Sequence, residues 1–257
     1  MVNQTIVSST NDTVRIDALT LSHRELNARL RDEVADGTRK IELRNVYGQR
    51  YIGTDLNVPV EIDISGVPGN DLGAFMNGPR IVVHGNAQDG CGNTMNDGHI
   101  IVHGHAGDIT GMAARGGKIY IRDDVGYRAA IHMKEYRRKK PVLVIGGTAQ
   151  DFFGEYMAGG IVILLGLNLK RGEYHKAKFI GTGMHGGVIY IGEGVDDYQL
   201  GKEVGDAELE EKDHQVLHKY VSEFAAHFDY DAEKILKRKY IKLFPLWIRP
   251  YGRLYAY

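Results

Sequence analysis

Histidine is the residue type whose spacing in this sequence first suggests chemistry. His84 and His103 end similar Val/Ile-rich runs, and His99, His103 and His105 lie close together in the chain. Neutral imidazole is a common metal ligand, but alternate residues of a strand share a face, so His103 and His105 converge only if a strand continues through Gly104. Polar side chains stacked on the surface of a repeated fold are the simpler interpretation.

Two further candidates belong to other chemistries. His214 and His218 lie one turn apart on an expected helix, a geometry that can hold zinc, but no third ligand is apparent. Cys91 lies in the glycine-rich segment 89–93, and neither a base nor an electropositive setting for a thiolate is visible nearby. We therefore interpret the histidines as part of a solvated helix face and Cys91 as a small buried corner residue.

One segment matches the dinucleotide-binding pattern Gly-x-Gly-x-x-Gly, namely residues 181–186. That pattern binds a pyrophosphate only where a helix begins after it, whereas the strand-like run 188–191 follows here. The basic run 136–140, Tyr-Arg-Arg-Lys-Lys, is interpreted as a solvated insertion or a docking site for an acidic partner. No catalytic, cofactor-binding or metal residue is predicted.

Composition excludes several classes of protein. Lys and Arg total 32 against 33 Asp and Glu, so no global field attracts nucleic acid or an anionic membrane. The single cysteine excludes a disulfide framework, a four-cysteine zinc site and a self-contained iron–sulfur cluster. No apolar run reaches the roughly 20 residues of a membrane span, and residues 1–15 show no signal-peptide core. A soluble cytoplasmic protein is expected.

Glycine separates short strand-like runs along most of the chain. There are 33 glycines among 257 residues, well above the ordinary usage of about 7%. The runs begin near positions 61, 81, 100, 119, 142, 161 and 188, so most of the steps between them are nearly equal. The steps from 119 to 142 and from 161 to 188 are longer, which indicates insertions at 133–140 and 169–178 that project from the repeat.

A second pattern repeats in phase with these runs. Glycines at five corners are each followed one short turn later by Met76, Met95, Ala114, Met157 or Met184. The repeat is too short for a strand and an ordinary crossover helix, but it suffices for one coil of a solenoid. The sequence therefore predicts an all-β, right-handed parallel β-helix of about nineteen residues per coil, with the methionines stacked inside.

Open strand edges at the ends of a solenoid must be covered. Ser22 and Glu25 form a capping box for a helix to about Asp36, and residues 206–228 are amphipathic, so α-helical caps are expected at both ends. The predicted division is an N-terminal arm and capping helix at 1–36, the β-helix at 37–195, and C-terminal helices with an aromatic tail at 196–257. The tail from 241 onward holds Phe244, Trp247, Tyr251, Tyr255 and Tyr257 and is expected to lie against this chain or a partner.

Several of these segments carry a family resemblance. Residues 154–166 and 183–191, Gly-Met-His-Gly-Gly-Val-Ile-Tyr-Ile, resemble the GXGXG domain, which is the C-terminal β-helix of the glutamate synthase large subunit. Residues 40–50 and 249–257 extend the resemblance over nearly the whole chain. It is most similar to the free-standing third-domain proteins of split, archaeal-type glutamate synthases.

The resemblance implies a non-catalytic structural or docking subunit beside two partners. One is a glutaminase (amidotransferase) subunit that releases ammonia from glutamine, and the other is a synthase subunit that uses FMN and an iron–sulfur cluster to make glutamate from 2-oxoglutarate. An amidotransferase of this family needs an N-terminal cysteine, where this sequence has Met1-Val2, and the cluster needs several cysteines. We expect docking through the two insertions and the aromatic tail, and self-association remains an alternative.

Other protein classes also have repeats of this kind. The β-helix subunits of formylmethanofuran dehydrogenase and of N-methylglutamate synthase have similar repeats. A stand-alone β-helix enzyme acting on carbohydrate would need clustered carboxylates or a calcium site on an outer face, whereas Asp108, Asp123 and Asp124 are scattered in the sequence.

Overall fold

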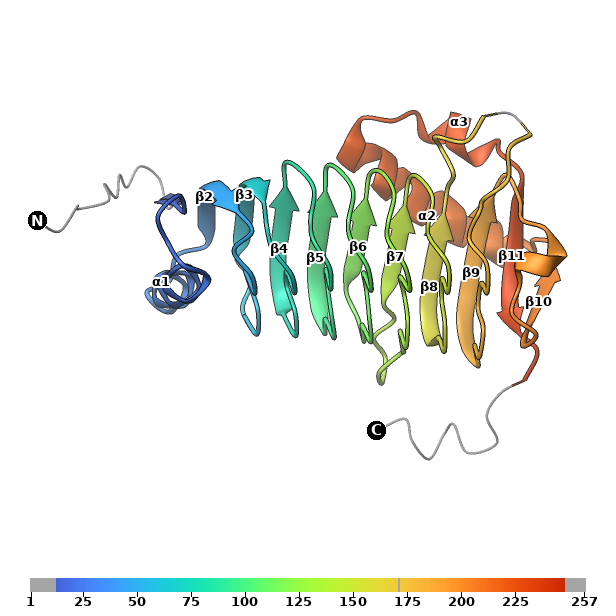
Figure 1. Ribbon diagram of the computed structural model, residues 1–257, viewed down its shortest axis with the longest axis horizontal. Helices are drawn as coiled ribbons and strands as arrows, with labels where there is room; N and C mark the ends of the chain where they lie inside the picture. The colour runs from blue at the N-terminus through green and yellow to red at the C-terminus, as the bar shows by residue number, and fades with distance from the viewer. Residues whose placement is uncertain (1–12, 171, 248–257) are drawn as a thin grey trace, which may run out of the picture.

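The computed structural model describes residues 13–170 and 172–247. They wind into a parallel β-helix of about 6 turns (Figure 1). Nine consecutive strands each pair in parallel with the next: β1 (Thr13–Asp17), β2 (Lys40–Tyr47), β3 (Glu61–Val67), β4 (Asn77–Val83), β5 (Asp97–Val102), β6 (Lys118–Ile121), β7 (Val142–Ile145), β8 (Ala158–Leu164) and β9 (Gly186–Gly192). The predicted all-β parallel solenoid is confirmed.

The register of the strands follows the sequence repeat. Ile62, Ile81, Ile100 and Ile119 are successive partners, so equivalent residues of these coils stand beside one another. The register takes a longer step where Lys118 pairs with Val142, and again where Ile161 pairs with Val188. The two longer steps therefore lie where the sequence placed them.

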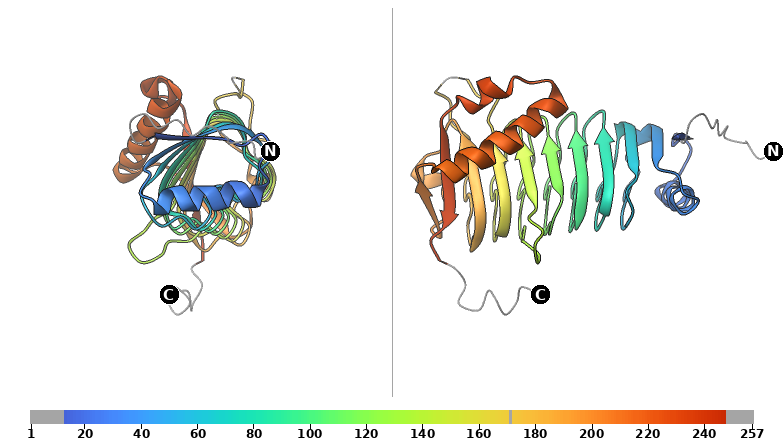
Figure 2. Two further views of the ribbon diagram at one scale, coloured as in Figure 1. Left: turned by 90° about the vertical axis from the view of Figure 1, so that its left-hand side faces the viewer. Right: turned by 180° about the vertical axis from the view of Figure 1, so that it is seen from behind.

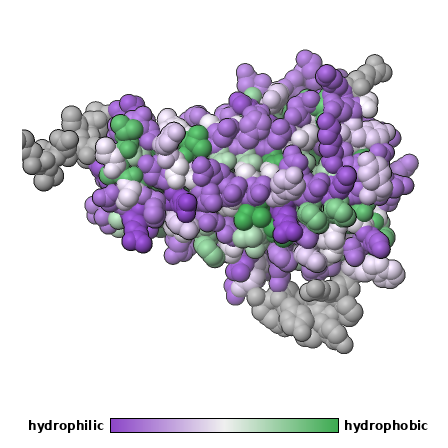
Figure 3. All heavy atoms as spheres, viewed as in Figure 1, coloured by the Kyte–Doolittle hydropathy of each residue, from purple (hydrophilic) through white to green (hydrophobic). Residues whose placement is uncertain are grey.

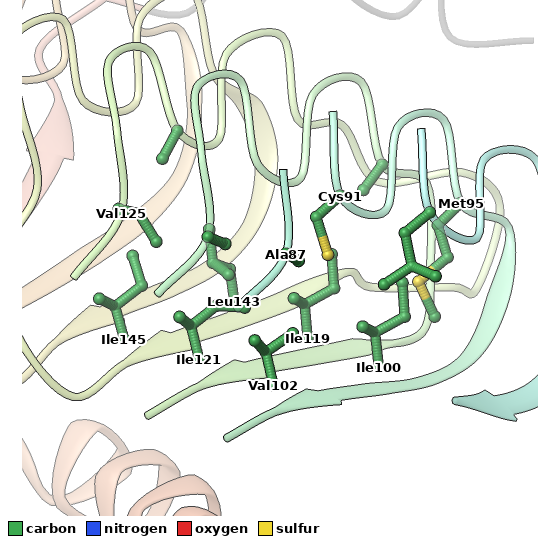
Figure 4. Close-up of a cluster of buried hydrophobic side chains, with 14 of the residues drawn as sticks. Ala87, Cys91, Met95, Ile100, Val102, Ile119, Ile121, Val125, Leu143 and Ile145 are labelled. Atoms are coloured by element: carbon green, nitrogen blue, oxygen red, sulfur yellow. The ribbon is translucent and has the colours of Figure 1, made fainter. Parts of the chain in front are cut away.

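Apolar side chains fill the interior of the coils. Strand residues such as Ile100, Ile119 and Leu143 face Cys91 and Met95 across the coil (Figure 4). The predicted ladder of Met76, Met95, Ala114, Met157 and Met184 is buried throughout.

The structure adds Met133 to this ladder and thereby corrects the boundary of the first insertion. Met133 is fully buried, and its N–H donates to Ala130 O at 3.1 Å, as Met157 N–H donates to Gly154 O. Ala130 occupies the glycine position with a φ of 63°, so the glycine pattern did not reveal this coil. The exposed part of the insertion is limited to residues that follow Met133.

The second insertion does not project along its whole length. His175 and Ala177 are buried, and Gln199 Nε2 donates to both of their carbonyl oxygens at 2.7 Å. Tyr174 and Lys176 remain exposed. Gln199 lies in the short 3-10 helix η1 (Asp197–Gln199), which fastens this insertion to the last coil.

The N-terminal end of the solenoid carries the expected helical cap. Helix α1 (His23–Ala35) begins with the predicted capping box of Ser22 and Glu25, and Leu26 and Leu30 are buried in the common core. The helix crosses the end of the coils (Figure 2, left).

The C-terminal helix occupies a different place from the one expected. Helix α2 (Glu211–Phe228), followed by α3 (Ala232–Leu236), lies along the outer face of the sheet (Figure 2). That face is apolar at Ile101, Tyr120 and Val144, which pack with Phe224 in a second core. Covering this face buries hydrophobic area that would otherwise be exposed to water.

A strand pair covers the C-terminal end of the solenoid instead. β11 (Tyr240–Pro245) pairs antiparallel with β9, and β10 (Val204–Ala207) pairs with β11. Leu243 of β11 is fully buried, so the first part of the aromatic tail lies against this chain, while Trp247 is 73% exposed. Tyr251, Tyr255 and Tyr257 lie outside the described residues. No helix among the described residues combines the length and the apolar character that crossing a membrane requires.

Candidate functional site

Each coil contains a corner segment in which every second residue has a positive φ. In one coil these residues are Phe152, Gly154 and Tyr156. The N–H groups of Phe152 and Tyr156 each donate to the next coil at 2.8 Å, whereas Gly154 N–H donates to the preceding coil at 2.9 Å. The N–H groups of these three residues thus donate in turn to the next coil, the preceding coil and the next coil. These hydrogen bonds hold all three residues in the left-handed region.

The middle position of this segment explains the recurring glycine. A Cβ built on Gly154 would lie 2.6 Å from Ile189 Cδ1, inside the packed core. The first and third positions face outward, and in several coils they hold glycine or small residues. Large side chains occupy other such positions, including Tyr51, Phe75 and Ile109 in earlier coils. In three later coils they lie close enough to form a continuous group.

We call the group in these later coils the corner face, which consists of Arg128, His132, Phe152, Tyr156 and Phe179. Their φ values lie between 52° and 63°. A bulky residue in this region is a true outlier and costs about 1–3 kcal/mol, which persists only where the surrounding structure enforces it. Large side chains thus occupy positions at which the backbone conformation favours glycine.

The side chains of the corner face stack from coil to coil. The rings of Phe152 and Phe179 are 4.9 Å apart and nearly parallel, and Arg128 lies 5.1 Å from the Phe152 centroid. His132 and Tyr156 stack at 5.3 Å. Phe179 remains 50% exposed and Tyr156 41%. Such rigid, half-exposed aromatic and arginine side chains are the types enriched at protein interfaces.

Hydrophobic residues form a broken row among hydrophilic ones on the side of the solenoid shown in Figure 3. Beside Phe152, a shallow cavity of about 510 Å³ extends over Asp108, Tyr127 and Arg128.

Aspartate side chains also connect neighbouring coils. Asp108 Oδ1 accepts the N–H of Tyr127 at 2.8 Å, and Asp124 Oδ1 accepts that of Thr148 at 2.6 Å. These carboxylates therefore bridge neighbouring coils at two different positions of the repeat, and neither bridge was recognised from the sequence.

The strand histidines stack as predicted. The rings of His84 and His103 are 5.4 Å apart, His103 packs edge-on against Phe228, and His84 Nε2 lies 2.8 Å from Asp63 Oδ1. His105 is separate, since its Nδ1 accepts the N–H of Asp124 at 3.2 Å. Within 13–170 and 172–247, no three His, Cys, Asp or Glu side chains are grouped so as to hold a metal ion.

The remaining candidates also follow the simpler interpretation. His214 and His218 are both exposed on α2. Residues 181–186 run directly into β9 without a helix, and Gly181 is a middle corner glycine with a φ of 67°. The segment thus lacks the following helix that this pattern uses to bind a pyrophosphate.

Two carboxylates anchor α2 to the sheet. Glu223 Oε2 lies 2.6 Å from Lys118 Nζ and also accepts the Tyr120 hydroxyl. Asp213 accepts the Tyr190 hydroxyl at 2.7 Å and pairs with Lys242 Nζ of β11 at 2.8 Å. Although burial opposes ionisation of Glu223, hydrogen bonds from Lys118 and Tyr120 hold its pKa below the usual value.

We expect the packing of α2 to weaken in mild acid. Burial lowers the pKa of His99, His103 and His227, and the positive charges of Arg80 and, for His99, Lys118 lower it further. A histidine with a lowered pKa binds protons preferentially in the unfolded chain, so stability is lost as the pH falls below about 6.5. Urea unfolding at pH 8, 7, 6 and 5.5 measures this loss.

The control for this pH dependence is His227→Gln, which removes one of the three groups. The variant should show a shallower fall in the free energy of unfolding between pH 7 and 5.5. The carboxylate of Glu223 does not explain a loss in this range, because its pKa is lowered and it titrates at more acidic pH. An unfolding free energy that is constant from pH 8 to 5.5 contradicts the prediction.

Cys91 is expected to be unreactive in the folded protein. Its side chain is fully buried, and burial raises the pKa of the thiol to about 12. Since the thiolate is the nucleophile, a thiol reagent at pH 8 should label Cys91 only at the rate at which the fold opens. Titration with and without denaturant measures this rate, and rapid labelling of the native protein would show that the interior is open.

Alternating left-handed corners and a packed parallel sheet define this chain as a glycine-cornered β-helix. The model of the family described as the GXGXG motif matches residues 18–249, and the chain belongs to that family. The GXGXG domain is related to glutamate synthase. The uncharacterized protein MJ1350 of Methanocaldococcus jannaschii is 50% identical over 251 residues, which cover 95% of this chain and 96% of that protein. The archaeal relative is thus similar to this chain over nearly its whole length.

Proposed function

We propose that this chain is a non-catalytic docking subunit of a multi-subunit glutamate synthase. In this assembly a glutaminase subunit releases ammonia from glutamine, and a second subunit with FMN and an iron–sulfur cluster makes glutamate from 2-oxoglutarate. The relation of the GXGXG domain to glutamate synthase supports the assignment. The docking role is inferred chiefly from the corner face.

The corner face fits a docking role for an energetic reason. Five large side chains occupy left-handed positions, and glycine at any of them would relieve backbone strain. The side chains of Phe179 and Tyr156 are about half-exposed, so burial within this chain does not offset the backbone strain. Burial against a partner subunit would do so, because aromatic anchors contribute strongly when they are desolvated at an interface.

Substitution of the two stacked phenylalanines tests the proposal. We expect Phe152→Ser/Phe179→Ser to weaken binding to the recombinant glutaminase and synthase subunits at least about 30-fold, since a stacked pair of aromatic anchors contributes about 2 kcal/mol or more. Size-exclusion chromatography and titration of the mixed subunits measure the effect. Binding as strong as that of the wild type contradicts the role of the corner face.

A matched control removes two exposed aromatic residues elsewhere. Tyr47 is 90% exposed and Tyr198 is 74% exposed, and both lie outside the corner face. Tyr47→Ser/Tyr198→Ser should bind the partner subunits normally. Thermal unfolding of both double variants should match the wild type, which separates loss of docking from loss of folding.

A further inference from the structure

A second surface feature lies apart from the corner face. The segment after Met133 projects below the other coils (Figure 1) and borders an open cavity of about 610 Å³. We call this cavity the basic groove. Its volume is within the range of about 300–1,000 Å³ that is typical of sites for small molecules.

One wall of the basic groove is a row of polar side chains from successive coils. Asn77, Asn96 and Arg115 each directly follow the buried ladder residue of their coil, and Asn57 follows the buried Leu56. Neighbouring strands of a sheet are about 4.8 Å apart, so the row presents amide groups and one guanidinium at regular intervals. Amide groups both donate and accept hydrogen bonds, which suits a polar ligand.

The basic run forms another part of the lining. Arg137, Arg138 and Lys139 all line the groove. Lys139 Nζ is held in place by Asp97 Oδ2 at 2.9 Å and by Asn77 Oδ1 at 3.0 Å. Arg137 lies over the ring of Tyr136, 5.2 Å from its centroid.

Two of the guanidinium groups lack partners. Among the described residues, the side chains of Arg115 and Arg138 make no hydrogen bond or ion pair. Both are exposed, and they line one cavity. Three arginines and one lysine belong to the described lining, which holds no acidic residue, although the chain as a whole has a net charge of -1. The positive charge is therefore local to the groove.

We propose that the basic groove binds a small molecule that carries two or more carboxylate or phosphate groups. The guanidinium groups of Arg115 and Arg138, which come from different segments of the lining, can each form two parallel hydrogen bonds with such a group, and the asparagine row can contact the polar part of the ligand. The site goes beyond the proposed docking role, because it uses none of the residues of the corner face.

Calorimetric titration of the full chain tests this proposal with inorganic pyrophosphate and citrate as probes. We expect saturable binding of at least one probe at low salt, weakened by added NaCl. Arg115→Gln/Arg138→Gln should reduce the affinity about 10-fold or more for each arginine, since a charge-assisted hydrogen bond contributes about 1.5–3 kcal/mol. Arg24→Gln/Arg31→Gln on α1 removes the same charge from exposed positions and should leave binding unchanged.

Three results would overturn the proposal. The first is that neither probe binds, and the second is that the double variant in the groove binds as tightly as the wild type. The third is that a hexaglutamate peptide binds at least ten times more tightly than both probes. The last result would show that the groove accepts an acidic polypeptide in place of a small molecule. Because the corner face is intact in these variants, failure here leaves the docking experiment unaffected.

Discussion

Phe224→Ala is expected to destabilise the protein by about 3–5 kcal/mol, the usual cost of removing a fully buried aromatic side chain. Phe224 of α2 has no exposed surface and stacks on the ring of Tyr230 at 5.8 Å. A Cβ built on Gly146 would lie only 2.7 Å from Phe224 Cζ, so the ring packs directly on the backbone at the end of β7. Truncation leaves a cavity between the helix and the solenoid.

Urea unfolding followed by circular dichroism measures this effect. His218→Ala is the matched control, because His218 is exposed on the same helix, and it should change stability by no more than about 0.5 kcal/mol. If Phe224→Ala costs less than about 1 kcal/mol, α2 does not form part of the cooperative core.

Gly92→Val should destabilise the fold by roughly 2–5 kcal/mol through two separate causes. Gly92 has a φ of 71°, where an L-residue costs about 1–2 kcal/mol. A Cβ at this position would lie 2.3 Å from Ile119 Cδ1, and overpacking of a core costs about 1–3 kcal/mol more. The midpoint of denaturant unfolding reports the sum.

Gly37→Val separates the two causes. Gly37 also has a positive φ, 97°, but its added Cβ would meet nothing within 4 Å. It should therefore show the backbone cost alone. Equal losses at the two positions would contradict the packing explanation for the middle corner glycines.

Much of the fold could be predicted because the repeat has a direct physical cause. Glycine permits the left-handed corner, and β-branched residues pack between coils, so both recur at the coil spacing. The corner that leads to Met133 was missed because Ala130 adopts the corner conformation in place of glycine, with a φ of 63°. The coil spacing alone would have located it, since Lys118 and Val142 are partners on successive strands and a corner must lie between them.

The position of α2 was harder to predict than its existence. An amphipathic pattern shows that a helix has an apolar face but does not show which surface that face covers. One signal was present: runs such as Ile100-Ile101-Val102 are apolar at successive positions, which is typical of a strand buried on both faces. The outward residues Ile101 and Tyr120 are indeed covered by α2.

The corner face depends on geometry that the sequence does not display. Phe152 and Phe179 belong to different coils with an insertion between them, so their stacking at 4.9 Å does not follow from the regular spacing of the repeat. The left-handed conformation of these positions follows from inter-coil hydrogen bonds, and glycine in equivalent positions of other coils is its only trace in the sequence.

The docking role is tested most directly by purification of the tagged native chain from its own cells, with every stoichiometric partner identified by mass spectrometry. We predict a complex that contains a glutaminase subunit and an FMN- and iron–sulfur-containing synthase subunit, and that loses both with Phe152→Ser/Phe179→Ser. Stoichiometric subunits of formylmethanofuran dehydrogenase or of N-methylglutamate synthase, or a chain that purifies without partners, would contradict the proposed function.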